Sequence, residues 1–135
     1  MPIALEIVSP EKLLLARSAD MVVIPASEGD MGVLEGHTPM IVMLRGGTIA
    51  LYDGDQVTDR LFVAGGFAEV TPERCTVLAN QAVPVASLVR AEAEHRLAEA
   101  EAAYEATDKT DMAAEEAAQD RVQSARAMVE ATEGA

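Results

Sequence analysis

The amino-acid sequence predicts an all-β domain, built as a sandwich or flattened barrel, followed by an antiparallel hairpin of two helices. Short β-branched and aliphatic runs, separated by turn residues, fill the first part of the chain. The composition changes near Pro84: all six prolines lie at or before this residue, and every glycine except Gly134 precedes it. The remainder is rich in alanine, glutamate and arginine, which favour helix. We therefore divide the chain into residues 1–85, a β-sandwich domain, and residues 86–135, a helical hairpin.

Eight apolar runs in the first part are expected to form strands, because they are short, rich in β-branched side chains and bounded by turn residues. The runs cover residues 3–7, 12–16, 21–24, 40–44, 48–52, 60–64, 67–71 and 75–79. Asp53-Gly54-Asp55 is expected to form a hairpin turn, and Gly46-Gly47 and Gly65-Gly66 are expected to form further turns. No helical stretch long enough for a parallel crossover interrupts the series, so most strands should pair antiparallel.

The second part is expected to form helices over residues 87–106 and 111–131, with a break at residues 107–110. Thr110 or Asp111 can cap the second helix. The short connection makes the two helices antiparallel neighbours. Large apolar side chains are few, so alanine must line most of the seam, and each alanine buries little surface. We therefore expect a hairpin of modest stability that can detach without unfolding the β-domain.

The net charge of −13 excludes nucleic acid and anionic membrane surfaces as natural partners, because both are themselves negative. A basic protein surface is a better electrostatic match. The longest apolar runs are far too short to span a bilayer, and no secretory signal is expected. The single cysteine, Cys75, cannot form an internal disulfide and is expected to be a buried strand residue, which fits a reducing, cytoplasmic compartment.

Catalytic and metal-binding patterns are not predicted. His37 and His95 are far apart in sequence, and Cys75 is near neither, so no metal site is expected. The chain has no nucleophile elbow and no phosphate-binding loop ending in Gly-Lys. The acidic residues of the hairpin fit a solvated helix face better than a site for acid–base chemistry. We therefore expect no catalytic residue, no metal and no cofactor.

Residues 25–40 hold the densest set of constrained backbone in the chain, with three glycines and two prolines around His37, and are expected to form a tightly built loop or a contact surface. Here the chain resembles the epsilon subunit of bacterial F-type ATP synthase, called delta in the mitochondrial enzyme. The matching residues are Pro25, Glu28-Gly29-Asp30-Met31-Gly32-Val33-Leu34, Gly36-His37-Thr38-Pro39, Leu44-Arg45-Gly46-Gly47, Val63-Ala64-Gly65-Gly66-Phe67-Ala68-Glu69-Val70, Val77-Leu78-Ala79, Arg90-Ala91 and Arg96.

The resemblance implies a sandwich of about ten strands, followed by two antiparallel helices, in a non-catalytic rotor subunit of the central stalk. Such a subunit couples proton flow through the membrane sector to ATP synthesis, at the cytoplasmic face of the bacterial inner membrane. The resemblance further implies contact with the gamma subunit and the ring of c subunits, and possible transient contact with the catalytic head. The implied ring-contact residues are Ser27, Glu28, Gly29, Asp30 and Met31, with Glu28 and Asp30 as the polar contacts. The implied gamma-contact residues are His37, Thr38 and Pro39.

Two departures from the family pattern concern the hairpin. The nucleotide-binding signature keeps Arg90 and Ala91, which we interpret as a vestigial site, but Ser87 replaces its acidic residue. Residues 111–135 hold six acids and only Arg121 and Arg126 as bases, so an acidic partner should repel the second helix, and self-inhibition should be weak or absent. Three alternatives stay open: an ATP-sensing subunit whose hairpin binds nucleotide and changes shape, a stand-alone adaptor that does not associate with gamma, and, least favoured, an enzyme.

Overall fold

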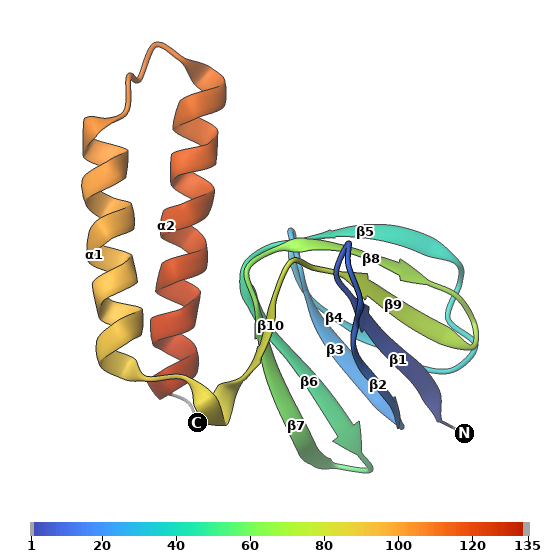
Figure 1. The fold of residues 1–135 in the computed structure, drawn as a ribbon. Coiled ribbons are helices and arrows are strands. Elements are labelled where there is room, and N and C mark those ends of the chain that lie inside the picture. The colour runs from blue at the N-terminus through green and yellow to red at the C-terminus, as the bar shows by residue number, and fades with distance from the viewer. Residues whose placement is uncertain (1, 134–135) are drawn as a thin grey trace.

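The computed structural model describes residues 2–133, which form a β-domain and a hairpin of two helices (Figure 1). The ten strands are β1 (Ile3–Val8), β2 (Leu13–Ala19), β3 (Met21–Ala26), β4 (Gly29–Val33), β5 (Met40–Leu44), β6 (Gly47–Asp53), β7 (Gln56–Val63), β8 (Gly66–Val70), β9 (Arg74–Leu78) and β10 (Ala82–Pro84). A short 3-10 helix, η1 (Val85–Ser87), leads to α1 (Arg90–Ala106) and α2 (Met112–Glu133). The predicted fold class is therefore confirmed, with ten strands and two helices in the described part of the chain.

The strands form one continuous sheet in the order β10-β7-β6-β3-β5-β8-β9-β1-β2, and β4 pairs with β3 beside this path. All pairs are antiparallel except β1 with β9, which agrees with the mostly antiparallel prediction. Strands β1 and β3 contact each other, as do β2 and β6. The sheet therefore curls until its two halves face one another as a sandwich (Figure 1).

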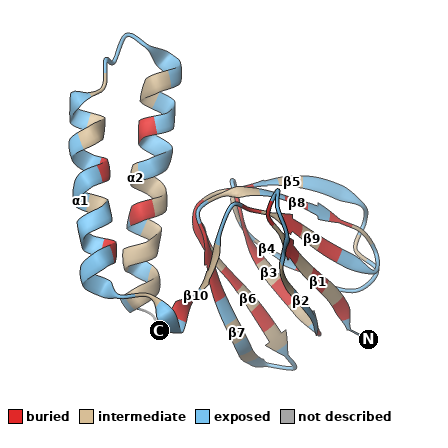
Figure 2. Cartoon of the chain, in the orientation of Figure 1, coloured by how far each residue is buried: buried red, intermediate tan, exposed pale blue. Residues whose placement is uncertain are grey.

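The core of the β-domain comes from the inward-facing residues of the alternating strands. In β1, Ile3, Leu5 and Ile7 are fully buried, whereas the residues between them are half-buried. The core is aliphatic, as expected from a chain without tryptophan, and Cys75 lies fully buried within it. Burial dominates the β-domain but is sparse in the hairpin (Figure 2), so most of the hydrophobic stabilisation belongs to the β-domain.

The expectation that residues 25–40 form a loop is wrong in its first half. Strand β3 runs on to Ala26, and Gly29 begins β4, so Ser27 and Glu28 form the two-residue turn of a tight hairpin. Gly29 has φ +142°, a conformation that side-chain-bearing residues rarely adopt. The sequence Gly29–Val33 contains two glycines and an aspartate, residues with low β-propensity, and backbone pairing with β3 overrides that preference.

Helix α1 begins at Arg90, not at residue 87 as predicted, because Val85–Ser87 form η1 and Leu88 is extended. In α2, Asp111 is the cap: its Oδ1 accepts a hydrogen bond from the Ala114 N–H at 3.1 Å. The buried residues of the hairpin are alanines at seven-residue spacing, Ala93, Ala100, Ala118 and Ala125, as the alanine-lined seam predicts. Within residues 2–133, no helix is both long and apolar enough to cross a membrane.

Candidate partner-binding surface

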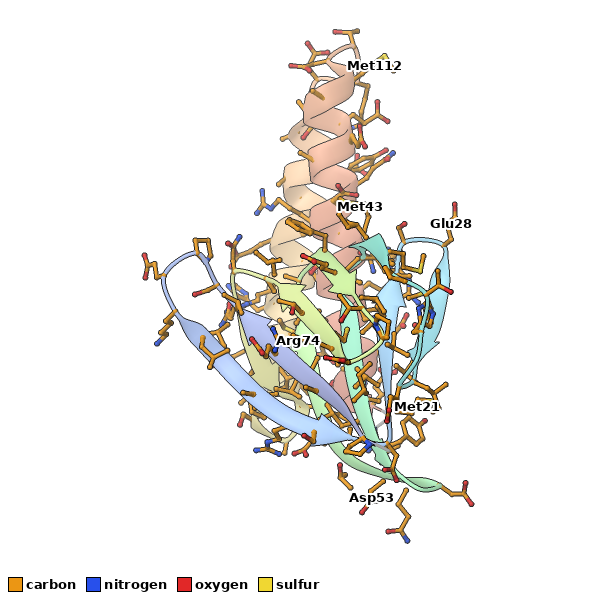
Figure 3. All side chains as sticks on the ribbon, turned by 90° about the vertical axis from the view of Figure 1, so that its right-hand side faces the viewer. Met21, Glu28, Met43, Asp53, Arg74 and Met112 are labelled. Atoms are coloured by element: carbon orange, nitrogen blue, oxygen red, sulfur yellow. The ribbon has the colours of Figure 1, made fainter. Side chains whose placement is uncertain are left out.

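The tip of the β3–β4 hairpin carries the residues predicted to contact a membrane-embedded ring. Ser27 and Glu28 are exposed at the turn, and Glu28 projects away from the β-domain (Figure 3). Gly29, Asp30 and Met31 follow as the first residues of β4, and Met31 packs partly against the core. The five residues therefore lie on one continuous element, with its polar groups outward.

Asp30 differs from Glu28 because it has a partner within the chain. Its Oδ1 lies 2.7 Å from the Nη2 atom of Arg45, which follows β5. Among the ion pairs of the described residues, none includes Glu28. Glu28 is therefore the acid at the tip without an ion-pair partner among the described residues, whereas Asp30 is paired with Arg45.

His37, Thr38 and Pro39 form the end of the connection between β4 and β5. The His37 N–H donates to the Leu34 carbonyl oxygen at 3.2 Å, and the His37 Nδ1 lies 2.8 Å from the Thr38 carbonyl oxygen, so Nδ1 carries the proton in this contact. Gly36, with φ +84°, donates its N–H to the Pro72 carbonyl oxygen at 2.7 Å. The segment is thus a fixed turn that delivers the chain into β5.

An exposed apolar stripe, which sequence reasoning missed, continues from this turn. It consists of Ile41 and Met43 of β5 and Phe67 of β8, and Ile41 and Met43 are 72% and 63% exposed. Met43 and Phe67 are cross-strand partners, so their side chains lie on the same face of the sheet. The uninterrupted apolar run Met40–Leu44 could have indicated this stripe. A strand with one buried face needs apolar residues only at alternate positions, so a continuous run leaves apolar side chains on the exposed face as well. Glu28 and Met43 lie at the same end of the β-domain, opposite Asp53 (Figure 3).

Arg90 and Ala91, the predicted vestigial nucleotide site, are the first residues of α1 and are exposed. The Arg90 Nε donates to Glu94 at 2.9 Å, and its Nη2 donates to Glu133 of α2 at 3.1 Å. The hydrogen bond to Glu94, with the charges of Glu133 and Glu94, raises the pKa of Arg90. Arg90 therefore pairs with two carboxylates of the hairpin itself, which leaves its charge compensated.

A cavity of about 310 Å³ lies between the hairpin and Ala64 of the β-domain, and neither Arg90 nor Ala91 lines it. Its charged lining residues are Arg96, Glu99, Asp120 and Arg121. Two acids thus accompany two bases, which gives the cavity no net positive charge to favour a phosphate group.

Helix α2 is the helix that packs against the β-domain, through β6 and η1 (Figure 1). Its Gln123 makes two hydrogen bonds to one residue: Oε1 accepts from the Gly46 N–H at 3.0 Å, and Nε2 donates to the Gly46 carbonyl oxygen at 2.7 Å. Ser124 lies so close to Gly46 that a Cβ there would be 2.6 Å from its Cα and Oγ. The glycine at this position therefore allows the close approach of α2.

The chain matches known proteins over nearly its full length. Residues 2–85 match the family model of the ATP synthase delta/epsilon chain β-sandwich domain. The chain is 70% identical to the ATP synthase epsilon chain of Granulibacter bethesdensis, over 95% of each chain. It is 48% identical to the ATP synthase epsilon chain of Gluconacetobacter diazotrophicus, over 99% of this chain and 95% of the relative.

Solved structures share the fold at lower sequence identity. A chain of the Euglena gracilis mitochondrial ATP synthase, in a structure of OSCP, F1 and c-ring, matches with a TM-score of 0.78 and 24% identity, over 96% of this chain and 81% of that one. A chain of the Tetrahymena thermophila mitochondrial ATP synthase central stalk and c-ring matches with a TM-score of 0.63 and 14% identity, over 98% and 97%.

Proposed function

This chain belongs to the ATP synthase delta/epsilon family, and from that membership we propose that it is a central-stalk rotor subunit of a proton-translocating F-type ATP synthase. The chain is an accessory subunit of the complex and not a catalytic one. In the proposed role it couples proton flow through the membrane sector to ATP synthesis in the catalytic head. The observation that carries the proposal is the pairing, at one end of the β-domain, of an unpartnered acid at a hairpin tip with an exposed apolar stripe.

The tip supports a contact with the c-ring. Glu28 offers an uncompensated negative charge on a short turn, which complements a basic loop of a partner. The backbone behind it is paired with β3 over five residues, so the charge sits on an ordered strand pair. Ser27, Gly29, Asp30 and Met31 complete the proposed contact, with Asp30 acting through its pair with Arg45.

The apolar stripe and the turn before it support a contact with the gamma subunit. His37, Thr38 and Pro39 lead directly into β5, which carries Ile41 and Met43 of the stripe, so one partner can cover both the turn and the stripe. Adjacent exposed apolar side chains of this kind are typical of interaction surfaces. A stable partner at this place would remove Ile41 and Met43 from water.

The hairpin is proposed to contribute little to inhibition of ATP hydrolysis. The net negative charge of residues 111–135 disfavours approach to an acidic surface of the catalytic head. The alternative, an ATP-sensing hairpin, would need Arg90 to leave Glu94 and Glu133 before it could hold a phosphate. Calorimetry with ATP on the isolated chain separates the two, since a micromolar dissociation constant would favour the sensor.

The proposed site of action is the cytoplasmic face of the bacterial inner membrane, where the chain is held peripherally by its partners in the complex. Residues 1–85 would carry the contacts with gamma and the ring, and residues 86–135 would remain the separable part. Neither the domain division nor the assignment of contacts depends on a bound nucleotide or metal.

Reversal of the charge at the tip tests the ring contact. In the assembled enzyme in membrane vesicles, Glu28→Lys should lower ATP-driven proton pumping about two- to tenfold, because it places like charges against the partner. Asp55→Lys is the matched control, since Asp55 is exposed in the β6–β7 turn at the opposite end of the β-domain. Equal pumping by both variants would refute the assignment.

Deletion of residues 87–135 tests the role of the hairpin. ATP hydrolysis by the assembled enzyme should remain close to that of the intact complex, since the acidic second helix is repelled by an acidic head. A several-fold rise in hydrolysis after deletion would show that the hairpin is inhibitory and would overturn this part of the proposal.

A further inference from the structure

Strand β4 is the weakly supported element of the proposed contact surface. It pairs with β3 and lies off the main path of the sheet, so one of its edges has no strand neighbour in the described fold. It also contains Gly29 and Gly32, which contribute no side-chain packing. An edge strand of this composition opens more readily than a central strand. Contacts from outside the β3–β4 pair therefore matter for the order of the tip.

Arg45 supplies such a contact from the end of β5. Its N–H donates to the Pro25 carbonyl oxygen of β3 at 2.9 Å, and its guanidinium reaches Asp30 of β4 at 2.7 Å. Pro25 and Asp30 are themselves cross-strand partners. One residue thus binds both strands of the hairpin. Its β3 partner, Pro25, lies two positions before Ser27 at the start of the turn, and its β4 partner, Asp30, lies two positions after Glu28 at the end of the turn.

The conformation of Arg45 is in turn limited by helix α2. The Gly46 N–H belongs to the peptide group that joins Arg45 to Gly46, and it is held by the Gln123 side chain, which also binds the Gly46 carbonyl group. Gly46 is buried beneath Ser124, so water has little access to these two backbone groups. Because the Gly46 N–H shares a peptide group with Arg45, holding it limits the backbone freedom of Arg45, whose guanidinium lies 2.7 Å from Asp30.

We propose that docking of α2 through Gln123 on Gly46 orders the tip of the β3–β4 hairpin by positioning Arg45 on Asp30. The two elements that change state are the helical hairpin, docked or released, and strand β4, closed or frayed. Release of the helical hairpin would loosen the tip that carries Glu28. Because coupling between two equilibria is reciprocal, binding of a partner to the tip would in turn favour docking of α2 on the β-domain. This coupling holds whatever molecule the tip contacts.

The expected effect of helix release on the tip follows from the solvent exposure of the Arg45–Asp30 ion pair. The side chains of Arg45 and Asp30 are 35% and 63% exposed, and ion pairs of that exposure are weak. Release of the helical hairpin should therefore make the exchange of backbone amide hydrogens at the tip about two- to fivefold faster. The Gly46 N–H would lose its partner in the described fold, the Gln123 Oε1 atom, so its exchange should become about tenfold faster or more.

Native-state hydrogen exchange of the full-length chain tests the coupling. Gln123→Ala removes the clamp on Gly46, and Gln119→Ala is the matched control, because Gln119 is exposed on the same helix and bonds only to Glu115. The reporters are the Gly46 N–H for docking and the Ser27 N–H, which donates to the Met43 carbonyl oxygen at 2.9 Å, for the tip. Protected amides of the paired strands β1 and β9 confirm that each variant is folded.

The expected result is faster exchange at Gly46 and Ser27 in Gln123→Ala and unchanged exchange in Gln119→Ala. In the background of Asp30→Asn, which cuts the second link, Gln123→Ala should no longer affect Ser27, although it should still affect Gly46. Faster exchange at Gly46 with no change at Ser27 would show that docking and tip are independent. Unchanged exchange at Gly46 would show that Gln123 does not hold the helix. Either outcome overturns the proposal.

Discussion

Substitution of Gly46 by alanine is the sharpest test of how the helical hairpin rests on the β-domain. An alanine Cβ at this position would lie 2.6 Å from the Cα and Oγ of Ser124 and 2.7 Å from its Cβ. Carbon atoms in favourable contact are about 3.5–4.0 Å apart. Since the Ser124 backbone belongs to α2, the overlap cannot be removed by rotating a side chain, and the helix must move away by about 1 Å.

The energetic consequence follows from the two hydrogen bonds of Gln123 to Gly46, at 3.0 and 2.7 Å. A retreat of about 1 Å takes both beyond the usual limit for a hydrogen bond. Each bond contributes about 0.5–1.5 kcal/mol, so docking should weaken by about 1–3 kcal/mol. Gly46 is not among the glycines with positive φ, so alanine should introduce no backbone strain in the β-domain.

Distances between two spin labels report the docking directly. Labels at Met112→Cys, where the native side chain is 82% exposed, and at Asp55→Cys would span the hairpin and the β-domain, while the buried Cys75 stays unlabelled. Gly46→Ala should broaden the distance distribution and leave the unfolding of the β-domain nearly unchanged. Gly32→Ala is the control, because its Cβ would meet only the flexible Met21 side chain at 3.3 Å. An unaltered distribution in Gly46→Ala would refute the steric argument.

Three further predictions concern the β-domain and the charges of the chain. Gly66→Ala should destabilise the β-domain by about 3 kcal/mol or more in chemical unfolding, since φ is +121° and a Cβ would overlap the Leu78 carbonyl oxygen; Gly54→Ala, with φ +61° and open space, should cost about 1 kcal/mol. Burial raises the pKa of the Cys75 thiol from 9.0 to about 11, because the folded state disfavours the thiolate. The folded state therefore keeps its full stability below pH 9.0, and its free energy of unfolding falls as the pH rises from 9.0 towards about 11. Cys75→Val should therefore lose less thermal stability than the native chain between those pH values, and an equal loss would exclude a contribution from the thiol. Residues 1–85 and 86–135 each carry more acids than bases, so salt at about 1 M should increase the docked population seen by the spin labels, and a decrease would contradict net repulsion.

The fold could be predicted from the sequence because its signals are local. The alternation of Ile3, Leu5 and Ile7 and the turn at Gly54 specify strands and a hairpin within a few residues, and the loss of proline after Pro84 marks the change to helix. Strand β4 was missed because it forms by pairing with β3, and Arg45, which follows β5, contacts it; neither contact is visible in the propensity of Gly29–Val33. The secondary structure of such segments depends on tertiary contacts, which cannot be inferred from the periodicity of the sequence.

The contacts proposed for Ser27–Met31 and for His37, Thr38 and Pro39 stay predictions, and the side-chain contacts around them could not be predicted from the sequence. Nothing in the sequence distinguishes Glu28 from Asp30 as an available acid. The difference arises because Arg45, fifteen residues away from Asp30, reaches it across β3. The same holds for Gln123, whose amide meets Gly46 from seventy-seven residues away. Side-chain contacts at such separations follow from the assembled fold.

The distribution of charge at the tip is consistent with a surface that transmits force. An edge strand with two glycines is compliant, whereas a contact that carries torque under the proposed function needs a strand that resists displacement. Asp30 meets this need because its charge is used inside the chain, where Arg45 braces β4 against β3. Glu28, one residue beyond the last rung of the hairpin, has no such duty and can engage a partner. Under the proposed function, Asp30 would contribute stiffness and Glu28 recognition. Glu28→Gln should then reduce coupling because the charge offered to the partner is lost, and Asp30→Asn because the ion pair with Arg45 is lost.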